Sequence, residues 1–177
     1  MRLPALFFAF STILGAQEPP MPKPTPHHLA MKSLEGTWDA VVKMHMAPGK
    51  PPMESKGVEV NKLVLGGLWI QSEFTSEMMG APFEGRGLFG YDPATHKHVG
   101  TWVDSMTTSM ALSTGTCKNE CKEMTCFFKA PGMDGKPATF KEVSVEKDAD
   151  HRTMAMFIKG KDGAYHLNME IEYTRRK

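Results

Sequence analysis

The sequence has little net charge, which argues against one class of partner. Its 177 residues include 21 Lys and Arg against 20 Asp and Glu, so the formal net charge is only +1. A whole-molecule field of that size does not draw a protein to nucleic acid or to anionic lipid. We therefore expect no nucleic-acid partner, and the length predicts one domain with a single core.

Motifs of enzyme chemistry are also missing. No serine has the strand, turn and helix setting of a nucleophile, and Ser105 beside Asp104 lacks a cue for an activating histidine. Gly85 and Gly87 fall in an expected strand, where glycine permits a bend or bulge more often than it binds phosphate. We expect no enzyme and no catalytic residue, unless a carboxylate pair such as Glu73 and Asp104 lies buried side by side.

Cysteine is scarce and odd in number. Cys117, Cys121 and Cys126 are the only three, so at most one disulfide forms within the chain. If residues 118–120 form a hairpin loop, Cys117 and Cys121 flank it and can pair in an oxidising compartment, which leaves Cys126 as a free thiol. A zinc site needs further ligands, and no histidine lies close by in the sequence. We expect a structural role for the cysteines and no metal.

The amino terminus has the order of a secretory signal. A basic residue precedes an apolar run over residues 3–16, which gives way abruptly to polar sequence. The run is too short to span a bilayer comfortably, so we expect export to the periplasm or the medium, cleavage near Ala16 and no stable membrane insertion. The proline-rich residues 17–28 are expected to form a disordered tether before a single domain over residues 29–177.

Apart from a short helix expected over residues 29–36, helical periodicity is missing and a period of two replaces it. Over residues 165–174, apolar side chains at odd positions alternate with polar ones, which predicts a strand with a core face and a solvent face. Turn residues separate about ten such segments. The pattern predicts an all-β fold, an antiparallel up-and-down β-barrel with room for one small ligand.

Several segments resemble a known family. They are residues 34–40 (LEGTWDA), residues 65–74 (LGGLWIQSEF) and residues 82–106, in which Gly85, Gly87, Gly90, Tyr91 and Asp92 precede Trp102 and Asp104. They resemble family 1579 of the domains of unknown function, exported bacterial proteins that look like relatives of the calycins, the lipocalin and fatty-acid-binding barrels. The resemblance spans residues 34–173 and implies a calycin-like barrel, but it supplies no activity to transfer.

Haem and metal sites are lesser alternatives for such a barrel. Some ten-stranded calycin-like barrels bind haem through one histidine, and here only His151 or His166 could serve, if its ring faced inward. His96 and His98 could chelate a metal from one strand, but His96 falls in an expected turn. The 15 methionines are scattered, as in an irregular core, rather than grouped for cuprous ion. We expect no cofactor.

Four residues are predicted to lie near a ligand: Trp69, Arg86, Trp102 and Asp104. Trp102 and Asp104 share a strand face, and Arg86 is the expected partner of an inward carboxylate. Such a cluster would orient a small, largely apolar molecule inside the barrel, although core packing and surface charge explain the same residues. The oligomeric state stays open.

The alternative function is that of a solid structural or interaction barrel without a ligand. It would act through its edges, its loops or its tether, and it predicts an exposed apolar patch around Met78, Met79 and Pro82.

Overall fold

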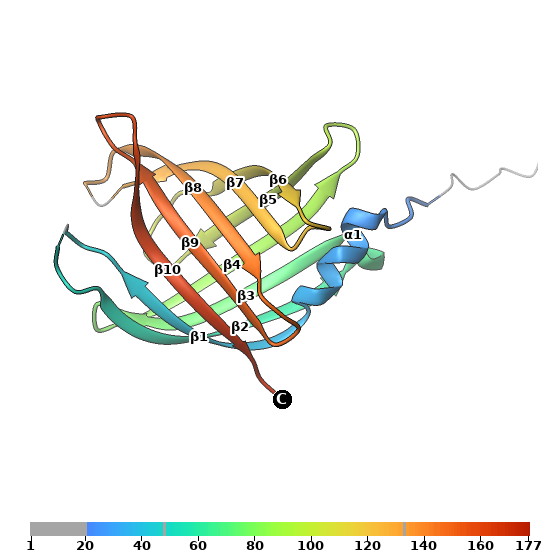
Figure 1. The fold of residues 1–177 in the computed structure, drawn as a ribbon, viewed down its shortest axis with the longest axis horizontal. Coiled ribbons are helices and arrows are strands. Elements are labelled where there is room, and N and C mark those ends of the chain that lie inside the picture. The colour runs from blue at the N-terminus through green and yellow to red at the C-terminus, as the bar shows by residue number, and fades with distance from the viewer. Residues whose placement is uncertain (1–20, 48, 133) are drawn as a thin grey trace, which may run out of the picture.

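The computed structural model describes residues 21–47, 49–132 and 134–177, and these residues form one closed β-barrel (Figure 1). The strands are β1 (Gly36–Met44), β2 (Met53–Val64), β3 (Trp69–Met78), β4 (Ala81–Asp92), β5 (Lys97–Asp104), β6 (Ala111–Lys118), β7 (Glu123–Pro131), β8 (Pro137–Glu146), β9 (His151–Lys159) and β10 (Tyr165–Arg175). Each strand pairs antiparallel with the next along the chain, and β1 pairs with β10 to close the barrel. The predicted up-and-down barrel is confirmed.

The two-residue alternation sets which side chains face inward. In β1, Trp38, Ala40 and Val42 are almost fully buried, as their spacing predicts. In β10 the rule holds for Ile171 and Tyr173 but fails at Leu167, which is exposed although the pattern places it in the core. The register of β10 against β9 shifts between Leu167 and Met169, and this irregularity reverses the faces beyond it.

The packed part of the core lies on one side of the barrel. Its largest buried cluster comes from β1, β3, β4 and β10 and consists of Trp38, Ala40, Val42, Phe74, Met78, Phe83, Ile171 and Tyr173. From β7 to β9 most side chains are only partly buried. The interior is therefore dense on one side and looser on the other.

A short helix covers one end of the barrel, which we call the closed end (Figure 1). It consists of α1 (Pro26–Ala30) and a 3-10 turn, η1 (Met31–Leu34); a second 3-10 turn, η2 (Leu65–Gly67), joins β2 to β3. The helix begins at Pro26, three residues before the predicted start, and Thr25 donates from its backbone N–H to Nδ1 of His28 at 3.1 Å. His27 and His28, which fall within the predicted tether of residues 17–28, are thus helical.

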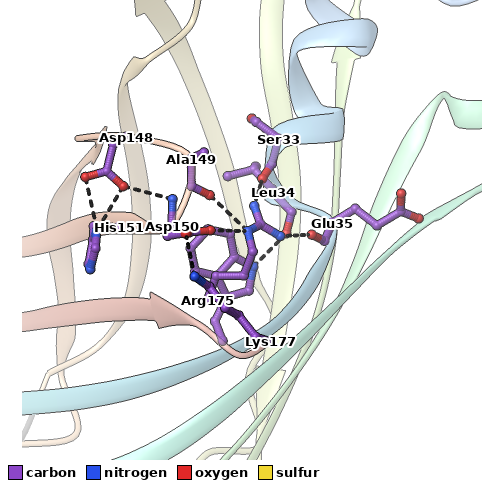
Figure 2. A network of polar contacts seen from close by, with 10 residues as sticks. Ser33, Leu34, Glu35, Asp148, Ala149, Asp150, His151, Arg175 and Lys177 are labelled. Carbon is purple, nitrogen blue, oxygen red and sulfur yellow. Dashed lines mark hydrogen bonds and ion pairs between the residues drawn. The ribbon is translucent and has the colours of Figure 1, made fainter.

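One arginine fastens this helix to the barrel, as Figure 2 shows. Arg175, at the end of β10, donates to the carbonyl oxygens of Ser33 at 2.7 Å, Glu35 at 2.6 Å and Ala149 at 2.9 Å. Its guanidinium also lies over the ring of Trp38, 4.1 Å from the centroid. These bonds join the helical segment, the β8–β9 hairpin and the last strand, so the closed end is rigidly capped.

The opposite end, which we call the open end, has no such helix among the described residues. It consists of the hairpins β1–β2, β3–β4, β5–β6, β7–β8 and β9–β10. No helix in the described part of the chain is long and apolar enough to cross a membrane. The predicted leader, residues 1–16, and residues 17–20 of the predicted tether lie outside the described residues, so export stays a prediction.

Candidate functional site

The barrel encloses a cavity of about 460 Å³. Its wall extends from Leu34 and Glu146 at the closed end to Thr107 and Ser109, which are exposed in the β5–β6 loop at the open end. This volume is within the range of sites that bind one small molecule. The interior is hollow, which does not favour the alternative of a solid barrel.

Most of the cavity wall is apolar and flexible. Seven of the 15 methionines line it: Met44, Met78, Met106, Met124, Met154, Met156 and Met169. Aromatic rings of β3, β4, β7 and β8 complete the wall with Phe74, Phe83, Phe89, Phe128 and Phe140. Methionine adapts its shape at low cost, so such a wall can accommodate ligands of different outline.

Two of the four predicted site residues, Trp102 and Asp104, lie in this wall. The indole Nε1 of Trp102 donates to Oδ2 of Asp104 at 3.2 Å. A Cβ atom at Gly85 or Gly87 would meet the Trp102 ring, and the β4–β5 register runs through both glycines without a shift. These glycines therefore allow the close approach of an aromatic ring, and the bend or bulge expected from the sequence is absent.

The other two, Trp69 and Arg86, do not line the cavity. On β3 the inward face belongs to Ile70, Ser72 and Phe74, so Trp69 lies on the outer face, where its ring packs across Gly90. The expected partnership of Arg86 with an inward carboxylate is wrong. Arg86 is exposed and pairs with Glu84 at 3.8 Å, because its inward neighbours Gly85 and Gly87 put it on the outer face of β4.

A buried pair of carboxyl groups, Glu73 and Asp104, would have favoured an enzymatic function. The structure does not bring these two side chains together. Glu73 accepts a hydrogen bond from Gln71 at 3.3 Å on the outer side of β3. Asp104 lies in the cavity wall and accepts from the backbone N–H groups of Met106 and Thr107, at 2.9 and 3.1 Å.

A second group of polar side chains lies inside the barrel, and we call it the Arg152 cluster: Glu59, Asn61, Glu142, Ser144 and Arg152. Arg152 of β9 donates from Nη2 to Oε1 of Glu59 on β2 at 2.5 Å. Asn61 donates to Glu59 at 2.5 Å and to the carbonyl of Leu34 at 3.1 Å, which places the cluster at the closed end. The guanidinium of Arg152 lies 3.7 Å from the ring centroid of Tyr173.

A second carboxyl group, that of Glu142 on β8, faces the same part of the cavity. It accepts from Oγ of Ser144 at 3.1 Å. Burial raises the pKa of Glu142, and the negative charge of Glu59 acts in the same direction, against the opposing effects of Ser144 and Arg152. Opposite Glu142 on β7, burial raises the pKa of the Cys126 thiol to about 12, so this thiol is neutral.

Two polar atoms of the cluster lack a hydrogen-bond partner among the described residues. They are Oδ1 of Asn61, an acceptor, and Nε of Arg152, a donor, and both are buried. Buried polar atoms without partners are costly and uncommon. The closed end of the cavity thus holds one acceptor and one donor whose hydrogen bonds are not made within the described residues.

The strand pattern contains a signal for these residues. Arg152 shares a strand face with Met154 and Met156, so the period of two places a charge among core residues. On β2 the usual assignment is inverted, because Glu59 and Asn61 are buried while Val58 and Val60 face outward.

Neither histidine proposed for haem faces the cavity. His151 pairs with Asp148 at 2.8 Å (Figure 2) and His166 with Asp162 at 3.0 Å, all exposed in hairpins. Among the described residues that line the cavity there is no histidine. The alternative of a haem site at His151 or His166, which required an inward ring, is therefore wrong.

A disulfide joins the predicted partners Cys117 and Cys121, whose Cα atoms are 4.7 Å apart, and Cys126 is a free thiol in the cavity wall. No histidine is close to the cysteines in the sequence, but the fold brings His27 and His98 near Cys117 and Cys121. Burial lowers the pKa of His98 to about 4. His96 occupies the β4–β5 turn with a positive φ of 54° and is not part of this group.

The apolar patch expected around Met78 is only partly present. Met78 faces the cavity, whereas Met79 and Pro82 are exposed at the open end. Met110 and Leu112 are also exposed, near the outward Phe127 of β7.

Comparison with known proteins agrees with the fold. The family described as a protein of unknown function, DUF1579, matches residues 23–175. No curated protein matches the chain. Among solved structures, Rv2717c from M. tuberculosis has a TM-score of 0.63 and 12% sequence identity, over 86% of this chain and 99% of that chain. At this identity the likeness concerns the fold alone.

Proposed function

The chain belongs to the DUF1579 family of proteins of unknown function, and we propose that its barrel binds one small, largely apolar molecule that carries a neutral polar group. The observation that carries this proposal is the Arg152 cluster at the closed end of a mostly apolar cavity of about 460 Å³. Apolar surface gives such a site its affinity, and a few placed polar groups orient the ligand.

A neutral group fits the charges of the cluster better than an acid does. The charge of Arg152 is already matched by Glu59, at 2.5 Å. Glu142 is a second acid on the same cavity, and a ligand carboxylate would approach both acids while losing its own hydration. A hydroxyl group can accept from Nε of Arg152 or donate to Oδ1 of Asn61, the two atoms without a partner among the described residues. We therefore propose an alcohol or a similar neutral head.

The rest of the ligand would lie along the apolar wall toward the open end. Trp102, hydrogen-bonded to Asp104, provides a flat surface there. The methionines around it can adjust their rotamers to the outline of the ligand.

The test uses native mass spectrometry of the protein after incubation with a total bacterial lipid extract, compared with the same sample denatured. Two variants on neighbouring positions of β7 form a matched pair. Ala130→Phe fills the cavity, because Ala130 lines it, and Lys129→Phe adds the same ring on the exposed outer face. We expect a mass excess on the wild type and on Lys129→Phe that disappears on denaturation, and none on Ala130→Phe. A bare wild-type mass, or an excess that persists on Ala130→Phe, would refute the proposal.

A further inference from the structure

Four potential metal ligands from separate segments meet beneath the helix at the closed end. They are His27 of α1, His98 of β5, Cys117 of β6 and Cys121 of the turn that follows. Their ligand atoms all lie within 4.8 Å of one another. The sequence separates them by up to 94 residues, so only the folded barrel assembles them.

We propose that, when both cysteines are reduced, these four side chains hold one Zn²⁺ ion in a tetrahedral Cys2His2 site. This proposal does not depend on ligand binding in the cavity, and either proposal can fail without the other.

The spacing between the ligand atoms fits that geometry. Zn–S bonds of about 2.3 Å and Zn–N bonds of about 2.0–2.1 Å at a tetrahedral angle require sulfur and nitrogen about 3.5 Å apart. Nδ1 of His27 is 3.6 Å from Sγ of Cys117 and 3.3 Å from Sγ of Cys121. Nε2 of His98 is 3.8 Å from Sγ of Cys121. Three sulfur–nitrogen edges of the tetrahedron are therefore near their required lengths while the disulfide is still in place, and its reduction lets the two sulfurs separate to the fourth edge.

The surroundings hold the two imidazole rings in place. The ring of His27 stacks on Tyr91, with centroids 4.0 Å apart and planes 11° from parallel. His98 is only 5% exposed and its ring also contacts Tyr91, at 5.1 Å between centroids. Ligands fixed in this way lose little freedom when they bind a metal.

The turn that carries Cys121 has an unusual backbone. Asn119, Glu120 and Cys121 adopt φ values of 51°, 57° and 65°, in the left-handed region that residues other than glycine rarely occupy. This run turns Cys121 back toward Cys117 and the histidines. Such conformations persist where surrounding interactions hold them, and they are common at binding sites.

The donor set points to zinc and to a structural role. Two thiolates and two imidazoles suit Zn²⁺, and four protein ligands leave no open position for a substrate. The ion would fasten α1 to β5 and to the β6–β7 turn, and so close the barrel beside the Arg152 cluster. The disulfide between Cys117 and Cys121, which the structure shows, is the competing state, because sulfurs bonded to each other are not thiolate ligands.

The test is a Co²⁺ titration of the reduced, metal-free protein, followed by displacement with Zn²⁺. We expect one Co²⁺ per chain, the visible bands of a tetrahedral ion and a thiolate-to-cobalt transition, all lost when one equivalent of Zn²⁺ is added. The oxidised protein should bind neither ion. An octahedral spectrum, a missing thiolate transition or metal binding by the oxidised protein would overturn the proposal.

Variants assign the ligands. His27→Ala and Cys121→Ser should weaken Zn²⁺ binding by a factor on the order of 100, while circular dichroism shows an intact barrel. Cys126→Ser and His166→Gln, which change the same residue types away from the cluster, should bind as the wild type does. Equal affinity of His27→Ala and the wild type would contradict the site even if the protein bound zinc elsewhere.

Discussion

The two ends of the barrel are built in opposite ways. At the closed end, hydrogen bonds from Arg175 fix the helix, and the Arg152 cluster fixes polar groups inside. At the open end, Met79 and Met106 are about half exposed, at 52% and 50%. Directional bonds specify one arrangement, whereas flexible apolar side chains tolerate many. Under the proposed function, the closed end would orient the ligand and the open end would adapt to its body.

The largest effect is expected from breaking the ion pair at the closed end. Arg152→Leu leaves the buried carboxylate of Glu59 without its cationic partner. Removal of one partner of a buried pair costs about 3–5 kcal/mol. Urea unfolding should show this loss in the free energy of unfolding.

The matched control removes the orphaned charge as well. The double variant Glu59→Gln with Arg152→Leu should be more stable than Arg152→Leu alone, because no carboxylate is left buried without a partner. If the double variant is the less stable of the two, Glu59 does not depend on Arg152 in the way described.

The second effect concerns the helix that caps the closed end. Arg175→Ala removes three hydrogen bonds to carbonyl oxygens of the helical segment and the β8–β9 hairpin. Hydrogen bonds from a charged group are worth more than neutral ones, so we expect a loss of about 2–3 kcal/mol. Hydrogen exchange should speed up in residues 26–35 far more than in the open-end hairpins. Uniform acceleration throughout the barrel would show that Arg175 does not hold the cap specifically.

A third, smaller loss of stability is expected from a substitution in the barrel wall between the two ends, where Trp102 packs on Gly85. Gly85→Ala puts a Cβ atom into the ring of Trp102, whereas at Gly132, in the open-end β7–β8 hairpin, a Cβ atom would meet nothing closer than 3.4 Å. Overpacking of this kind costs about 1–3 kcal/mol. We expect a lower unfolding midpoint and altered tryptophan fluorescence for Gly85→Ala and a near-normal Gly132→Ala. Equal effects of the two substitutions would contradict the close packing on Gly85.

The smallest effect is a pH dependence that arises from Glu142. Because its pKa is raised in the folded protein, the native state keeps this proton to a higher pH than the unfolded state does. Its contribution to stability is full below the ordinary glutamate pKa and is lost as the pH rises through the raised value. The unfolding free energy of Glu142→Gln should therefore fall less than that of the wild type as the pH rises from the ordinary glutamate pKa through the raised one.

The control for this prediction is an exposed glutamate. Glu77→Gln, on the outer face of β3 near the open end, should keep the wild-type pH dependence. An unchanged slope in Glu142→Gln would show that this carboxyl group is not shielded from water.

The fold could be predicted from the sequence because period-two alternation and turn residues are local signals. They identify strands such as β1 and β10 and the short connections between them. The exception at Leu167 has a physical reason, since the register irregularity that reverses its face depends on the neighbouring strand β9.

The site was predicted only in part. Trp102 and Asp104 lie in the cavity wall, but Trp69 and Arg86 were assigned to the wrong face, because alternation tells which residues share a face and not which face is inside. Glu59 could not be predicted as a site residue, because a polar side chain on a strand is expected to face the solvent. Its partner Arg152 lies 93 residues away, and only the closed barrel brings the two together.

The measurement that tests the account most directly is calorimetric titration of the protein near neutral pH with decanol and with decanoate. The two ligands have the same apolar chain and differ only in the head that would reach the Arg152 cluster. We predict that decanol binds at least about tenfold more tightly, because the carboxylate would lose its hydration beside Glu59, whose charge already matches that of Arg152. Tighter binding of decanoate, or no difference between the two, would contradict the account.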